Sequence, residues 1–192
     1  MGFSGGRLAT HIADIEAHTK NMFEESISGR WAMGLPLGTI STLNLANNIL
    51  YAIPFFVAHE QSYSDIGIYI TALEAGKLAR LGVYKLGANL LPSELVFDAG
   101  EVSLTLAQER TRPLAPLILP KGWYATAVIS DSTGVAALRA SKRAWSPWGW
   151  GVNINGTNHM YEKAQAYGVL PDPFGVGNFA DYDMFFVGLK TS

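Results

Sequence analysis

The sequence contains no cysteine, few charged residues and no long apolar run. Without cysteine, neither a disulfide framework nor a thiolate metal site can form, and cysteine usage says nothing about the redox compartment. No apolar stretch reaches the roughly 20 residues that a membrane-spanning helix needs, and the N-terminus lacks the basic-then-apolar pattern of a signal peptide. We therefore expect no insertion into a membrane.

The shortage of charge also bears on the partners of the chain. Charged residues make up 16% of the 192 residues, whereas average chains carry about 25%. The net charge is -2 and no long basic run occurs, so we expect no nucleic-acid partner. A chain of this length suits one domain with an appendage. Its apolar surplus is typical of a surface that partner chains partly cover.

Sequence motifs for catalysis or cofactor binding are also missing. The sequence has no nucleophile elbow, phosphate loop, paired-histidine zinc motif or calcium loop. The densest group of titratable residues is His59, Glu60 and Asp65, which we interpret as part of a solvated connection between two strands. We predict a non-enzymatic protein without cofactor or metal.

Residues 1–28 are predicted to form an arm and an amphipathic helix, with helical spacing from about residue 7 to residue 27. Their apolar residues recur at alternating intervals of four and three, which is heptad spacing. The seam consists of Leu8, Ile12, Ile15, Thr19 and Met22. Two interpretations remain open: the helix packs on its own domain, or it anchors the chain to another protein or to copies of itself.

The stretch from Lys121 to Asp131 is the centre of the predicted β domain, residues 29–192. Its middle, Trp123 to Ile129, is uncharged and lies between turn signals, which predicts a strand buried on both faces. Such a strand needs cover on both sides. The run from Met184 to Leu189 has the same character, so we expect it to be central and to pair with an early strand.

From Gly29 onward the dominant period is two, with about eight to ten short strands separated by turn signals. The predicted fold is mainly β, an antiparallel, jelly-roll-like β-sandwich preceded by an N-terminal α-helix. Pro54 predicts a sheet edge or a bulge within its strand, because proline cannot donate to a ladder.

Three later segments are harder to assign. The charged, proline-containing residues 107–116 are interpreted as a loop. Residues 135–138 fit either a strand or a helical turn, and residues 163–167 fit a helical turn. Residues 141–181 form a long Trp- and Gly-rich insertion. A long irregular insertion in a compact domain is usually functional or interfacial.

The insertion contains a tryptophan cluster, Trp145, Trp148 and Trp150. These rings could pack in a subunit interface. The alternative is that they hold a glycan, together with Tyr161 or Asn153, because tryptophan offers a flat apolar face and one polar group. Interface packing and glycan binding both remain possible interpretations of the tryptophan cluster.

Several segments together resemble a family of phage proteins. They are Leu50 to Val57, Ile66 to Ile70, Lys77 to Tyr84, Phe97 to Glu101 and Gly122 to Val128. Their pattern of strands and turns resembles the β-sandwich domains of bacteriophage virion proteins, such as tail fibres, receptor-binding tips and head fibres or decorations. The resemblance covers roughly residues 49–131.

This resemblance implies a location in the virion and a β domain that forms a homotrimer. It implies that residues 1–28 attach the domain to other virion proteins. The expected function is structural, and the alternative is a receptor-binding module that holds host-surface glycan on the loop at residues 145–150. A third possibility, a glycan depolymerase, would need two carboxylates across a cleft, and the sequence offers no convincing pair.

Overall fold

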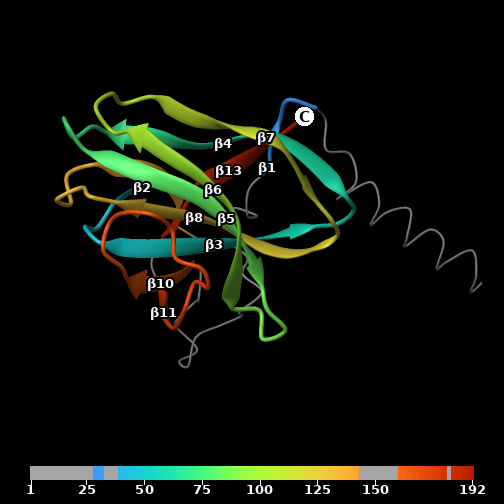
Figure 1. Ribbon diagram of the computed structural model, residues 1–192. Helices are drawn as coiled ribbons and strands as arrows, with labels where there is room; N and C mark the ends of the chain where they lie inside the picture. Colours follow the sequence, from blue (N-terminus) through green and yellow to red (C-terminus); the bar gives the residue numbers. More distant parts are fainter. Residues whose placement is uncertain (1–27, 33–38, 143–159, 181–182) are drawn as a thin grey trace, which may run out of the picture.

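The computed structural model describes residues 28–32, 39–142, 160–180 and 183–192, which form two antiparallel sheets (Figure 1). The first sheet contains β1 (Trp31–Ala32), β2 (Ile40–Asn44), β4 (Gln61–Ala72), β7 (Glu109–Leu119), β9 (Ala137–Ser141), β12 (Met184–Phe185) and β13 (Val187–Thr191). The second contains β3 (Ile49–Val57), β5 (Leu78–Leu86), β6 (Pro92–Ser103), β8 (Gly122–Ser130), β10 (Met160–Ala164) and β11 (Asn178–Ala180). The prediction of a mainly β, antiparallel protein is confirmed, whereas the predicted helix lies outside the described residues.

The two sheets share one large apolar core. Alternation with a period of two places every second residue of a strand inside. Ile66, Ile68 and Ile70 enter the core from β4 of the first sheet, and Leu81 and Val83 enter it from β5 of the second. These side chains are at most 2% exposed, so the interior is dry and closely packed.

Strand β8 lies between β3 and β5, and its residues from Tyr124 to Ser130 are all buried. Tyr124 and Val128 face the shared core, whereas Ala125, Ala127 and Ile129 belong to a second cluster on the outer face of the same sheet. The prediction of a strand buried on both faces is confirmed. The same sheet therefore needs an outer cover.

Residues 165–177, the strap, supply that cover. Leu170 and Phe174 are buried in the outer cluster. The Tyr84 hydroxyl donates to the carbonyl of Pro171 at 2.7 Å, and the backbone amide of Leu170 donates to Asp98 at 3.3 Å. This part of the predicted insertion is thus an integral layer of the domain.

Four local predictions had different outcomes. The predicted loop at residues 107–116 is wrong for residues 109–116, which belong to β7, and residues 163–164 of the predicted helical turn belong to β10. Residues 137–141 form β9, which fits the strand alternative for residues 135–138. The C-terminal run is central as expected, because β13 pairs with both β1 and β4.

Pro54 lies in β3, which is an inner strand of its sheet and not an edge strand. Its neighbour β8 pairs along the whole segment, but the described part of β10 pairs with β3 only as far as Ala52. Among the described residues Pro54 has a ladder partner only in β8, which spares the hydrogen bond that proline cannot donate. The predicted sheet edge or bulge fits this one-sided pairing of the described residues but not the inner place of β3 in its sheet.

We expect Gly82→Ala to destabilise the domain, because the strap packs directly over Gly82. An added Cβ would lie 2.8 Å from the carbonyl oxygen of Phe97 and would overlap the side chain of Leu170. Overpacking of this kind costs about 1–3 kcal/mol, so the urea midpoint should fall. Gly122→Ala is the matched control, since its nearest neighbour is the Tyr124 ring at 3.4 Å. Equal midpoints for the two variants would contradict close packing of the strap.

Candidate functional site

The outer face of the first sheet carries a groove whose floor is made by two glycines. Gly67 of β4 lies directly opposite Gly188 of β13, and neither fills the face with a side chain. The ring of Trp31, from β1, packs over Gly67, where an added Cβ would lie 2.7 Å from the indole. The sequence thus leaves a depression between β1, β4 and β13.

Tyr69 and Arg139 form the wall of this groove. Both lie on outward-facing positions, since Ile68 and Ile70 of β4 and Leu138 of β9 point into the core. The Arg139 Cζ lies 4.5 Å from the centroid of the Tyr69 ring, a cation–π contact that holds the guanidinium at a fixed place. The Tyr69 ring remains 40% exposed.

The guanidinium of Arg139 lacks a polar partner in the part of the chain that the structure describes. Its Nε is buried and has no hydrogen-bond acceptor. No described carboxylate forms an ion pair with it, although salt bridges elsewhere, such as Arg80 to Asp98 at 2.8 Å, are well made. A buried donor without an acceptor is costly, and Arg139 shares this feature with the Nε of Arg110 and the Nδ1 of His59.

Arg139 lines two adjoining hollows on this face. The first has a volume of about 120 Å³ and is lined by Trp31, Gly67, Ile68, Tyr69, Glu109, Arg139, Phe186 and Gly188. The second has a volume of about 530 Å³ and is lined by Thr39, Ile40, Ser41, Thr42, Thr71, Arg139, Lys142 and Asp183. We call the two hollows together the outer groove.

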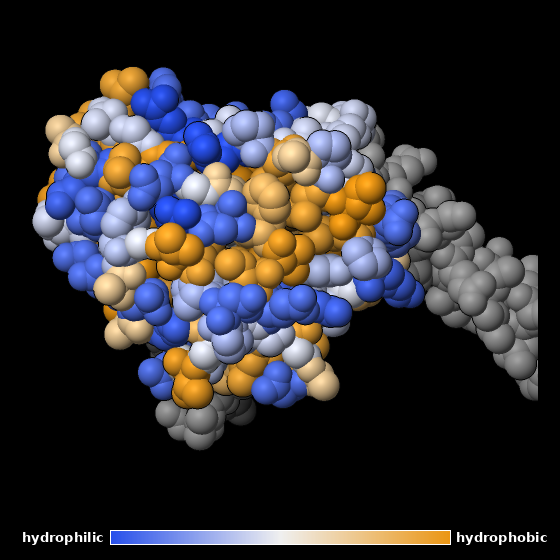
Figure 2. Space-filling view, in the orientation of Figure 1, coloured by the Kyte–Doolittle hydropathy of each residue, from blue (hydrophilic) through white to orange (hydrophobic). Residues whose placement is uncertain are grey.

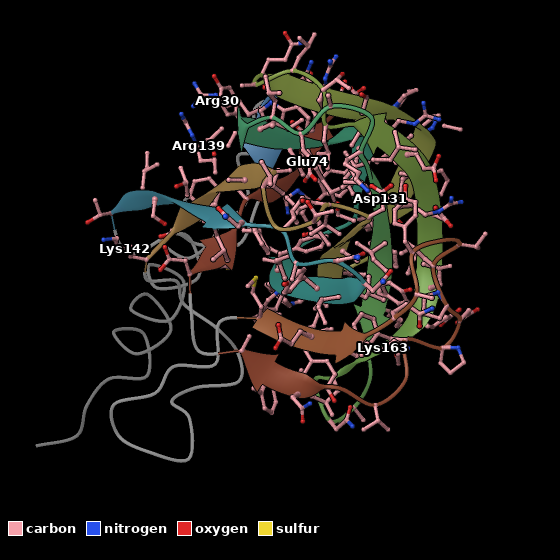
Figure 3. The ribbon with its side chains drawn as sticks, turned by 90° about the vertical axis from the view of Figure 1, so that its left-hand side faces the viewer. Arg30, Glu74, Asp131, Arg139, Lys142 and Lys163 are labelled. Atoms are coloured by element: carbon pink, nitrogen blue, oxygen red, sulfur yellow. The ribbon has the colours of Figure 1, made fainter. Side chains whose placement is uncertain are left out.

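The two halves of the outer groove differ in chemistry. The first half is mainly aromatic and glycine-lined, whereas the second is rich in hydroxyl groups. In the second half, Asp183 accepts a hydrogen bond from the hydroxyl of Ser41. Lys142 and Arg139 place two cations near that single carboxylate. Figure 3 shows Arg139 and Lys142 on one side of the molecule, away from Lys163 at the other end.

A carboxylate outside the groove fixes the loop that leads into β9, the strand of Arg139. Glu74, in the turn after β4, accepts hydrogen bonds from the hydroxyls of Ser132 at 2.5 Å and Thr133 at 2.6 Å. It also accepts one from the backbone amide of Ala136 at 3.2 Å. These bonds, that of Ser132 foremost, lower the pKa of the Glu74 carboxyl from 4.5 to about 2.

The residues predicted as sites are not in this groove. Trp145, Trp148, Trp150 and Asn153 lie outside the described residues, as does the predicted seam of Leu8, Ile12, Ile15, Thr19 and Met22. Tyr161 is described but belongs to the second sheet, where its hydroxyl bonds with the carbonyl of Gly177 at 2.9 Å. Within the described ranges no three histidine or acidic side chains are grouped to hold a metal. No described helix is long and apolar enough to cross a membrane.

Sequence reasoning missed Arg139 as a site residue. The one available signal is its setting, Ala137-Leu-Arg-Ala-Ser141, where an arginine alternates with core residues in a strand. That pattern places Arg139 on the outer face, but only the register of β4 against β9 brings it to Tyr69.

Comparisons with known proteins find a distant similarity in fold, with two chains of solved structures matching. No family model and no curated protein matches the sequence. The fold is similar to part of the crystal structure of the cysteine protease and lectin-like domains of Cwp84, a surface layer associated protein of Clostridium difficile, with a TM-score of 0.47 and 14% sequence identity. The match covers 80% of this chain and 36% of that chain.

We expect the stability contributed by Glu74 to disappear in acid. Its folded-state pKa, about 2, lies below the ordinary value of 4.5, so the contribution is complete above that ordinary value. It is lost as the pH falls toward 2, when the carboxylate becomes protonated. The difference in melting temperature between wild type and Glu74→Gln should therefore be largest near neutral pH and shrink below pH 4.5. Glu94→Gln, at an exposed position, is the control, and a difference independent of pH would contradict the assignment.

Proposed function

We propose that the chain is a non-enzymatic structural protein of a bacteriophage virion, in which a jelly-roll-like β-sandwich is displayed as a homotrimer. The virion location, the number three and the attachment of residues 1–28 to other virion proteins come from the resemblance of the strand pattern. One physical observation supports self-association: an apolar patch where the free edges of the two sheets meet.

β6 and β7 are edge strands of the two sheets, and they lie next to each other at this patch. β6 is the last strand of its sheet, and β7 pairs only with β4 among the described strands. Near one end the edges are joined, because the Arg112 Nε donates to the carbonyl of Ala99 at 3.1 Å. Val96, Phe97 and Leu117 pack against the core and remain only partly buried. The core is thus incompletely covered along this edge.

Figure 2 shows apolar side chains gathered in one patch over the region where Figure 1 places β6, β7 and β8. Exposed apolar patches of this kind mark interaction surfaces. The low charge of the whole chain, 16%, points the same way, since charged residues are depleted at the centre of interfaces. A neighbouring copy of the chain is the occupant we propose, and in a closed trimer it would meet this patch with a different part of its surface.

Receptor binding is the alternative function. In that reading, host-surface glycan is held by Trp145, Trp148 and Trp150, which stays a prediction because these residues lie outside the described ranges. The two functions can coexist in one protein. Replacement of the three tryptophans by alanine separates them, since a glycan site would lose binding and keep assembly, whereas interface residues would lose assembly.

We expect light scattering to give the mass of a trimer, both for the full chain and for a chain that starts at Gly29. Gly29 belongs to the β domain, because its backbone amide donates a hydrogen bond to the carbonyl oxygen of Thr191 at 2.9 Å. The shortened chain therefore keeps this contact. A trimer for both chains locates the association in the β domain. A trimer for the full chain alone would assign it to residues 1–28 instead. A monomer for both would contradict the proposal.

We expect Val96→Lys to dissociate the trimer, since a cation at the centre of an apolar contact must be desolvated without a partner. The matched control is Val176→Lys, because Val176 is 93% exposed on the strap. Sedimentation velocity should show a monomer for the first variant and the wild-type species for the second. Far-ultraviolet circular dichroism verifies that both are folded. An unchanged trimer in Val96→Lys would remove the β6–β7 edge from the interface.

A further inference from the structure

We propose that the outer groove is a binding site for a carboxylate-bearing saccharide, with Arg139 as its anion ligand. This inference does not rest on the virion proposal. The observation that supports it is the guanidinium of Arg139. Stacking on Tyr69 at 4.5 Å holds the group in place, and its buried Nε lacks an acceptor in the described part of the chain.

Arg139 and Lys142 give the larger hollow a net positive charge against the carboxylate of Asp183, whereas Glu109 lines the smaller hollow. The groups that line the groove with it are Glu109 from β7, Lys142 after β9 and Asp183 before β12. Asp183 is engaged by the hydroxyl of Ser41, and Glu109 is exposed at the far wall beside Tyr69. The hydroxyl-rich half therefore holds two cations and one already bonded carboxylate. A guanidinium fork matches a carboxylate with two parallel hydrogen bonds.

The remaining lining combines hydroxyl groups with aromatic rings, which suits a sugar. Four side-chain hydroxyls, of Thr39, Ser41, Thr42 and Thr71, line the larger hollow, and Ile40 is the one apolar residue among the described residues that line it. Hydroxyl groups can exchange hydrogen bonds with the hydroxyls of a pyranose ring. The adjoining hollow offers the partly exposed rings of Trp31, Tyr69 and Phe186, and aromatic rings pack against the apolar face of such rings.

The floor of the smaller hollow is built around Trp31. Gly67 and Gly188 face each other across β4 and β13, and the Trp31 indole packs over Gly67, where a Cβ would lie 2.7 Å from the ring. Both hollows adjoin through Arg139, so a carboxylate on one sugar can bond there while a neighbouring sugar packs on the aromatic half.

The test uses the full chain and isothermal titration with tetragalacturonate as the acidic probe. Its fully methyl-esterified form is the matched neutral probe, and tetraglutamate is the peptide probe. We expect the acidic saccharide to bind, the ester to bind at least about tenfold more weakly, and Arg139→Gln to lose affinity by a similar factor, as for loss of a charge-assisted hydrogen bond. Arg30→Gln is the control, because it makes the same change of net charge at an exposed residue outside the lining.

Melting temperature shows whether each variant is folded. If Arg139→Gln fails to fold, Arg139→Lys and Lys142→Gln replace it, since the first keeps the charge without the fork and the second removes the neighbouring cation. No binding of the acidic saccharide, equal binding of the ester, or unchanged affinity in the folded variants would overturn the proposal. Tighter binding of tetraglutamate would also overturn it and assign the groove to an acidic segment of a partner protein.

Discussion

A strand with apolar side chains on both faces must be covered on both faces, and β8 imposes this demand on the whole molecule. Its inward residues, such as Val128, meet the first sheet across the shared core. Its outward residues, such as Ala127, require a third layer, which the strap provides through Leu170 and Phe174. The first sheet faces no such demand, because its outward positions carry Gly67, Tyr69 and Arg139. Among the described residues, the second sheet thus has an outer layer over β8, whereas no such layer covers the first sheet.

Much of the fold was predictable because burial leaves a periodic trace in the sequence. The doubly apolar character of β8 and the alternation in β4 need no knowledge of the neighbouring strands. Strand β7 was missed because Pro113 and Pro116 and its arginines are typical of a loop. Those residues are tolerated where β7 forms a sheet edge. Likewise, Lys163 and its neighbours favour a helical turn locally, but pairing with β3 overrides that preference.

The groove was not predictable in the same way, because no segment contains it. Trp31, Tyr69, Arg139 and Lys142 come from distant parts of the chain and meet only through the pairing of β1, β4, β9 and β13. A period of two predicts that Arg139 faces outward, yet it cannot give the register that brings the guanidinium to the Tyr69 ring. Unpaired buried donors are also invisible in a sequence, since the lack of a partner is a property of the finished packing.

The place of β13 in the first sheet has a consequence for biosynthesis. This strand pairs with β1 and β4, and β12 pairs with β9, so residues 184–191 complete a sheet begun far earlier in the chain. A ribosome delivers the N-terminal segments first. Until Thr191 has left the exit tunnel, β4 lacks its partner beside Gly67, and Thr126 of β8 has no Val187 carbonyl to accept its hydroxyl. A product truncated before residue 184 would therefore present unpaired strand edges to chaperones and proteases.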